Sequence, residues 1–117
     1  MKPLHCWRCN RVVPMMNERE FAQFDTANTA AVRAIKSYRA RRNTALKDAP
    51  LARFYRPVRA LYRDLSRKAG LKAPLVDIHH LRQHRLADYG PPCKQCGLPL
   101  RTPEAKLCAA CGTRRAA

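Results

Sequence analysis

The chain has few aromatic residues, 7% of 117, and no run of apolar residues approaches the ~20 that a membrane-spanning helix needs. Because aromatic residues are few, the hydrophobic core is small, and a structural metal ion would add much to its stability. The first residues also lack the apolar run of a secretory signal peptide. We therefore expect a cytoplasmic protein without membrane contact, whose cysteines bind metal rather than form disulfides. Disulfides stay open if export uses another route.

Signatures of catalysis are missing as well. The sequence has no local pair of acidic residues, no glycine-rich phosphate loop and no His-Glu motif of metal-dependent hydrolases. Its eight carboxylates are scattered along the chain. We expect a non-enzymatic protein without a small-molecule substrate, although unassigned histidines could serve a nuclease.

What the chain does have is six cysteines in three Cys-x-x-Cys pairs, with none left over. Each of the last two pairs is followed by glycine, the residue that most easily adopts the positive φ of a metal-binding knuckle. Two such knuckles on a short hairpin predict a closed, structural zinc ribbon with four cysteine ligands, with iron as the competing metal. The predicted ligands are Cys93, Cys96, Cys108 and Cys111.

The N-terminal pair, Cys6 and Cys9, is followed by Asn10 and needs two further ligands to complete a site. His80 and His84 are four residues apart, so on a helix they share one face. The spacing favours a zinc site of two cysteines and two histidines that ties the N-terminus to a late helix, which makes two zinc ions per chain. Alternatives are a redox dithiol and histidines that lie on the surface or bind phosphate.

Helical signals dominate the middle of the chain. Residues 1–16 are expected to form a Cys-bearing knuckle and a turn closed by Pro14. Four helices are predicted. The first begins at Asn17, whose capping box is completed by Glu20, and the second covers 29–47. The third covers 49–69, with Asp48 as N-cap and Gly70 as stop, and the fourth covers 75–88. In the third helix, apolar residues that include Tyr62 recur at helical spacing and predict a face that packs in the core. Pro57 predicts a kink or a break in this helix. The fold class is mainly α: a small helical bundle stapled by zinc (residues 1–90) with a C-terminal zinc ribbon (residues 91–117).

Both ends of the chain carry a resemblance. The N-terminal stretch reads Cys-Trp-Arg-Cys and is followed by a Val-Val-Pro-Met turn. The stretch from His84 to Cys111 begins with His-Arg-Leu-Ala-Asp-Tyr-Gly-Pro-Pro-Cys. Both stretches resemble small uncharacterised bacterial zinc-ribbon proteins. The resemblance covers roughly the first 20 and the last 35 residues and implies a fold and a bacterial source, but no activity. That group usually has two adjacent histidines before Arg-Leu, where this chain has Gln83 and His84. The departure supports His84 as a ligand and leaves the fourth ligand uncertain.

The net charge of +16 indicates an anionic partner. Residues 33–72 contain thirteen Lys or Arg, two Asp and no Glu. One face of the third predicted helix carries Arg53, Arg56, Arg59, Arg63 and Arg67. Since the guanidinium fork suits phosphate, we expect this face to bind nucleic acid through the backbone. The alternative is a protein-protein interaction module, an adaptor or neutraliser of the immunity type, that docks on an acidic partner protein.

Overall fold

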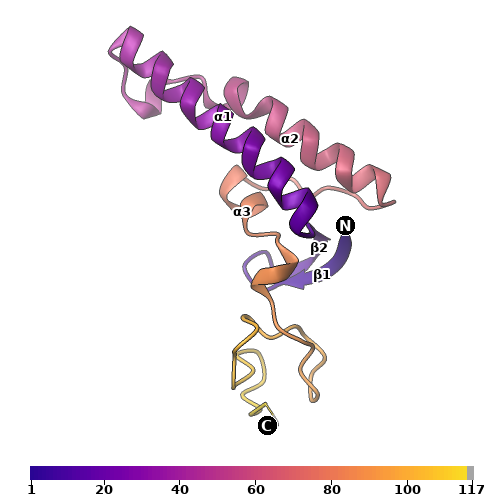
Figure 1. The fold of residues 1–117 in the computed structure, drawn as a ribbon. Helices are drawn as coiled ribbons and strands as arrows, with labels where there is room; N and C mark the ends of the chain where they lie inside the picture. Colours follow the sequence, from indigo (N-terminus) through magenta and orange to yellow (C-terminus); the bar gives the residue numbers. More distant parts are fainter. Residues whose placement is uncertain (116–117) are drawn as a thin grey trace.

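The computed structural model describes residues 1–115 and is mainly α-helical (Figure 1). A β-hairpin is followed by an antiparallel pair of long helices, a short helix and an irregular C-terminal segment. The last two residues of the predicted 91–117 ribbon lie outside the described residues. The elements are β1 (Lys2–Cys6), β2 (Arg11–Met15), α1 (Glu18–Arg42), η1 (Leu46–Asp48), α2 (Leu51–Lys68), α3 (Ile78–Arg82) and η2 (Leu86–Asp88), where η marks a 3₁₀ turn.

The hairpin of β1 and β2 replaces the simple knuckle and turn expected for residues 1–16. The two strands are antiparallel, with Lys2 opposite Met15 and Cys6 opposite Arg11. Pro14 does not close a turn but lies within β2, opposite Pro3. A two-stranded sheet tolerates proline because each strand has a free edge. The cysteine knuckle therefore sits at the tip of the hairpin.

Helix α1 is continuous where two helices were predicted. The predicted capping box is present, since the Asn17 side chain accepts a hydrogen bond from the Glu20 N–H and the Glu20 carboxylate accepts one from the Asn17 N–H. No glycine or proline interrupts residues 18–42, so polar residues around Asn28 do not end the helix. Asn43 ends it in the left-handed conformation, with φ of 47°.

Helix α2 matches the prediction at its end and differs at its start. Gly70 takes φ of +72° just after the last turn, as the predicted stop. Asp48 is not the N-cap, because it belongs to η1 and Pro50 occupies the cap. The helix runs unbroken through Pro57, which is exposed, so of the predicted kink or break the break is wrong.

The apolar face of α2 packs on α1, as the periodicity predicted. Phe24 and Tyr62 meet edge to face with ring centroids 6.4 Å apart, and Tyr38 meets Phe54 in the same way at 5.5 Å. Val58 and Tyr62 are almost completely buried. This packing leaves the basic side of the helical hairpin of α1 and α2 exposed to solvent.

The predicted fourth helix, 75–88, is reduced to the single turn of α3. Asp77 caps it by accepting from the His80 N–H, and the helix ends before His84. The next residues leave the helix because they bond to Met16, the residue after β2, instead. Met16 donates its N–H to His84 O at 2.8 Å and accepts from the Leu86 N–H at 2.9 Å. These non-local bonds replace the helical ones.

The molecule is elongated, about 55 × 30 × 21 Å, with a radius of gyration of 16.9 Å against the ~13 Å of a compact chain of this length. The helical hairpin extends to one end, the C-terminal segment lies at the other, and the β-hairpin lies between them (Figure 1). The C-terminal segment has its own small core of Cys93, Leu100 and Cys108. Among the described residues, no helix is long and apolar enough to cross a membrane.

Candidate metal centres

Four cysteines converge in the C-terminal segment, as the sequence predicted. Two loops supply them, and each loop is closed by one isolated β-bridge, Pro92 with Pro99 and Leu107 with Arg114. In each loop the glycine after the second cysteine donates its N–H to the carbonyl of the first, at 2.9 Å for Gly97 and 2.8 Å for Gly112. Both glycines have positive φ, +77° and +78°. The four ligands are Cys93, Cys96, Cys108 and Cys111.

The spacing of these sulfurs suits a tetrahedral ion. Cys93 Sγ lies 3.7 Å from Cys111 Sγ, and Cys96 Sγ lies 3.6 Å from Cys108 Sγ. Two thiolates bound at ~2.3 Å to one tetrahedral ion are about 3.8 Å apart. All six cysteines of the chain are free thiols. This group can therefore hold one metal ion, and four thiolates would leave it no open position.

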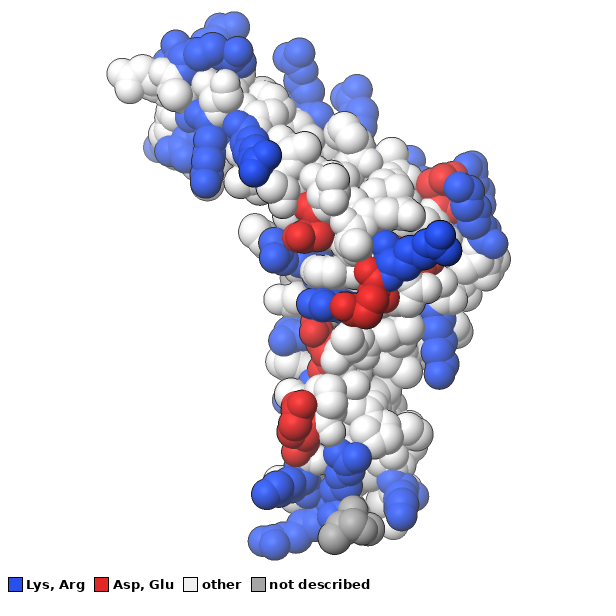
Figure 2. All heavy atoms as spheres, in the orientation of Figure 1, with Lys and Arg blue, Asp and Glu red and all other residues white. Residues whose placement is uncertain are grey.

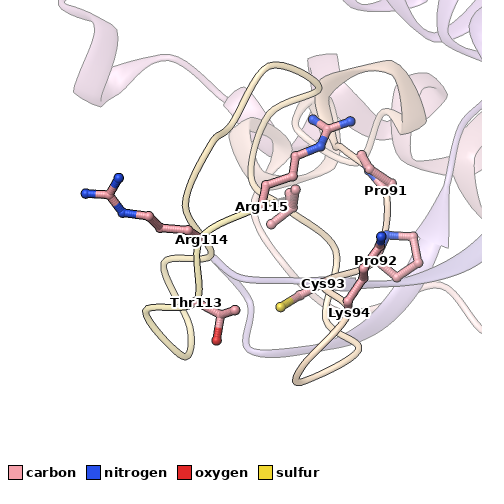
Figure 3. A pocket seen from close by; sticks show the side chains of 8 residues that line it. Pro91, Pro92, Cys93, Lys94, Thr113, Arg114 and Arg115 are labelled. Atoms are coloured by element: carbon pink, nitrogen blue, oxygen red, sulfur yellow. The ribbon is translucent and has the colours of Figure 1, made fainter. Parts of the chain in front are cut away.

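The four thiols of the C-terminal group differ in acidity. Backbone hydrogen bonds from Cys96 and Gln95 lower the pKa of Cys93. Against a backbone hydrogen bond from Leu98, desolvation and hydrogen bonds with the other three thiols raise the pKa of Cys96 to about 11. Hydrogen bonds with the side chain and backbone of Thr113 lower the pKa of Cys111 to about 6. Figure 3 shows the Cys93 sulfur pointing toward the loop that carries Thr113, while the Arg114 guanidinium extends away from the ribbon. A hollow of about 300 Å³ lies beside Cys93, lined also by Pro91, Pro92, Lys94, Leu100, Arg114 and Arg115. A thiol that is already deprotonated near neutral pH binds metal without a large proton cost.

A third knuckle has the same backbone geometry. Asn10 donates its N–H to Cys6 O at 2.7 Å and has φ of 54°, so it does what the glycines do in the ribbon. Cys9 Sγ lies 3.3 Å from His84 Nε2, and Cys6, Cys9 and His84 form one group whose ligand atoms all lie within 4.8 Å of one another. For comparison, a thiolate and an imidazole on one tetrahedral zinc are about 3.5 Å apart. The N-terminal knuckle is thus joined to a residue 75 positions away from Cys9.

The state of His84 fits a metal ligand. Its side chain is fully buried, and this burial lowers its pKa to about 4, so the ring is neutral. Tyr62 Oη lies 3.1 Å from His84 Nδ1 and donates its own hydrogen to Pro14 O. With that hydrogen committed, Tyr62 accepts from Nδ1–H, which leaves Nε2 unprotonated and directed at Cys9.

Cys6 also has a hydrogen-bond donor beside it. The hydroxyl of Tyr89 donates to Cys6 Sγ at 3.4 Å, and both side chains are buried. The sequence analysis did not identify Tyr62 or Tyr89 as residues of the site. Tyr62 was assigned to the helical core, where it does lie, and no local pattern marks either hydroxyl. Such partners orient metal ligands and tune their basicity.

His80, predicted as the fourth ligand, is not brought to this group. Its Nδ1 lies 3.0 Å from an Asp77 carboxylate oxygen, in a half-exposed pair. The prediction placed His80 and His84 on one helix, whereas the helix ends between them. Of the two predicted histidines, His84 alone lies with Cys6 and Cys9.

The predicted arginine face is only partly free. Arg53, Arg56 and Arg63 are exposed and form no ion pair among the described residues. Arg67 is paired with Asp64 at 2.6 Å, and Arg59 donates to Val76 O at 2.7 Å. Figure 2 shows Lys and Arg gathered at the free end of the helical hairpin, with little acidic surface nearby.

Comparison with known proteins finds no relative of this chain. No family model matches the chain, and neither the curated proteins nor the solved structures contain a significant match. The case for the two metal centres therefore rests on their geometry, and the family resemblance of the two ends remains a resemblance.

Proposed function

We propose that the protein is a non-enzymatic, nucleic-acid-binding protein that two zinc ions hold in shape. The observation that carries the proposal is the free end of the α1–α2 hairpin, residues 33–56, which we call the cationic tip. It contains eight Lys or Arg and one Asp, a net charge of +7. None of the ion pairs of the described residues includes one of these eight side chains. The basic members are Arg33, Lys36, Arg39, Arg41, Arg42, Lys47, Arg53 and Arg56.

Zinc is the metal that the donor sets favour. Four thiolates in one centre, and two thiolates with a neutral imidazole in the other, are ligands typical of Zn²⁺ in proteins. The C-terminal centre resembles a structural site because all its positions are taken. Since neither centre is part of the cationic tip, we assign both to holding the fold.

The cationic tip suits phosphate more than bases. Five of its six arginines are exposed, whereas Arg39 is half-buried and donates to Thr44 O. The guanidinium fork donates two hydrogen bonds to one anion. Tyr38 and Phe54 are packed on each other, so they are not free to stack on bases. We expect contacts to the sugar-phosphate backbone without strong sequence preference.

The salt dependence of binding tests this proposal. If about five phosphates are neutralised, the slope of log K against log salt concentration is about −4 to −5 on duplex DNA. Two double variants change the charge equally: Arg53→Gln with Arg56→Gln in the tip, and Arg63→Gln with Arg67→Gln outside it. The tip variant is expected to reduce the slope by about 2 and the control variant to change it little.

Two results would overturn the nucleic-acid assignment. One is a slope near zero, or no binding at ~0.1 M salt. The other is recovery of one stoichiometric acidic protein with the purified chain after nuclease treatment. That result supports the alternative module, which docks the cationic tip on an acidic protein surface.

A further inference from the structure

The two metal centres differ in the number of ligands that the chain supplies. The C-terminal group has four, whereas the N-terminal group has three, Cys6, Cys9 and His84. No fourth Cys, His, Asp or Glu among residues 1–115 joins these three at a similar distance. Zinc sites with three protein ligands keep their fourth position for an exchangeable ligand.

The side chains that could complete the N-terminal group are held elsewhere. Asp77 accepts hydrogen bonds from both the backbone and the ring of His80, so the cap of α3 keeps this pair together. His5 lies next to Cys6 in β1, and successive strand residues point to opposite faces of the sheet. The chain thus offers neither histidine to the centre.

Burial shows where an added ligand would approach. Cys6 and His84 have no exposed surface, whereas Cys9 is half-buried, so the centre meets solvent on the side of Cys9. Arg8 and Arg11 flank Cys9 in the chain and are both exposed, so the surface around the open side is basic. The Asp77 carboxylate is engaged by His80. A basic surface at the open side favours an anion.

We infer that the N-terminal centre is a site of two cysteines and one histidine with an open fourth position, which binds a small monodentate anion on the side of Cys9. The inference rests on the proposed function, because it needs the metal ion that we assign there. It gives the two centres different properties: the ribbon centre is closed, and the N-terminal centre exchanges one ligand with solvent.

Cobalt substitution in the full chain tests this inference. Co²⁺ replaces zinc with the same geometry and reports its ligands in its visible spectrum, and azide serves as the anion. We expect two cobalt ions per chain and a spectral shift that saturates with azide. The Cys93→Ser/Cys96→Ser variant is expected to keep the shift, and the Cys6→Ser/Cys9→Ser variant to lose it.

The possible failures are distinguishable. Two cobalt ions per chain without an azide response overturn the open position and leave the proposed metal centres intact. One cobalt ion, held by the ribbon, removes the N-terminal centre itself. A changed cobalt spectrum in His80→Ala would show that His80 is the fourth ligand. A spectrum that depends on protein concentration would show that a second copy of the chain supplies that ligand. Either result overturns the inference. If a double variant does not fold, the azide difference spectrum of the wild-type chain still decides whether a centre has an open position.

Discussion

At the scale of single residues, His84 connects the N-terminal centre to the helical core. One ring nitrogen faces Cys9, and the other faces Tyr62, which belongs to the core cluster that includes Phe24 and Val58. The sequence identified His84 through its spacing and its resemblance. It could not identify Tyr62 as its partner, because that contact joins residues 22 positions apart through packing.

The first prediction concerns this hydroxyl. Tyr62→Phe removes the acceptor of Nδ1–H while keeping the ring in the core. We expect a 10- to 100-fold loss of zinc affinity at the N-terminal centre, about the size typical of an outer-shell partner. Competition with a chromogenic chelator measures it. Tyr55→Phe on the same helix is the control, since its hydroxyl forms no hydrogen bond with the described residues. Equal affinities in both variants would contradict the assigned role.

The second prediction is a pH dependence of stability in the metal-free, reduced protein. Burial lowers the pKa of His84 to about 4 in the folded state, from 6.5 in the unfolded chain. Between these values the unfolded state binds the proton first, so stability is complete above pH 6.5 and falls as the pH approaches 4. The full loss is about 3 kcal/mol.

Denaturant titrations across that pH range measure the free energy of unfolding. His84→Gln is expected to flatten the dependence, whereas His80→Gln keeps it, because His80 is half-exposed. If the pH dependence disappears in His80→Gln and persists in His84→Gln, its assignment to His84 is wrong.

At the scale of elements, the sequence was most informative where the signal is local. The capping box at Asn17, the stop at Gly70 and the positive φ after each cysteine pair are all present. These features depend on a few neighbouring residues and their backbone preferences. The apolar face of α2 was equally visible because its period is that of a helix.

The elements that the sequence missed depend on distant partners. The chain from His84 to Leu86 leaves the predicted helix because Met16 bonds to it from across the fold. The strands Lys2–Cys6 and Arg11–Met15 pair with each other across the cysteine knuckle. The contact of Met16 with His84 and Leu86 has no local signature, so the histidine pair on one helix face was a reasonable but wrong expectation.

The third prediction concerns Pro57, which lies inside α2 and faces solvent. Proline lacks the N–H that would bond to the carbonyl of Arg53, and it costs up to ~3 kcal/mol relative to alanine in a helix interior. We therefore expect Pro57→Ala to stabilise the protein by about 1–3 kcal/mol, measured by denaturant titration of the zinc-loaded chain. Ala60→Gly, one turn later on an exposed site, is the control and is expected to destabilise by about 1 kcal/mol. No gain in Pro57→Ala would mean that the helix is already adapted to the proline.

At the scale of the whole molecule, the protein has three small cores instead of one large core. One lies between the long helices, one joins the β-hairpin to Tyr89, and one lies inside the C-terminal segment. Each of the last two includes cysteines of a metal centre. In an elongated chain with such small cores, a bound metal ion would add to stability, as structural zinc does in small domains, where its apparent binding free energy is on the order of 10–16 kcal/mol.

The contacts between the cores determine how far the loss of a bound metal ion would affect the rest of the molecule. The C-terminal segment meets the rest of the chain at Gly90, which donates its N–H to Leu100 O at 2.8 Å, and at Trp7, whose ring centre lies 4.2 Å from the Arg101 guanidinium. The N-terminal centre is connected more closely, because His84 bonds to Tyr62 in the helical core and its backbone bonds to Met16.

The fourth prediction follows from this difference. Cys93→Ser/Cys96→Ser is expected to lose one zinc ion and the ribbon structure, while the helical signal in far-ultraviolet circular dichroism and its melting temperature change little. Cys6→Ser/Cys9→Ser also loses one zinc ion, but it is expected to lower the melting temperature of the helices, since an unliganded, fully buried His84 then lies beside Tyr62. Zinc content and thermal melting of both variants measure the contrast. If both variants lose helix equally, the ribbon supports the helical core, and the weak contacts at Gly90 and Trp7 transmit more stability than their number indicates.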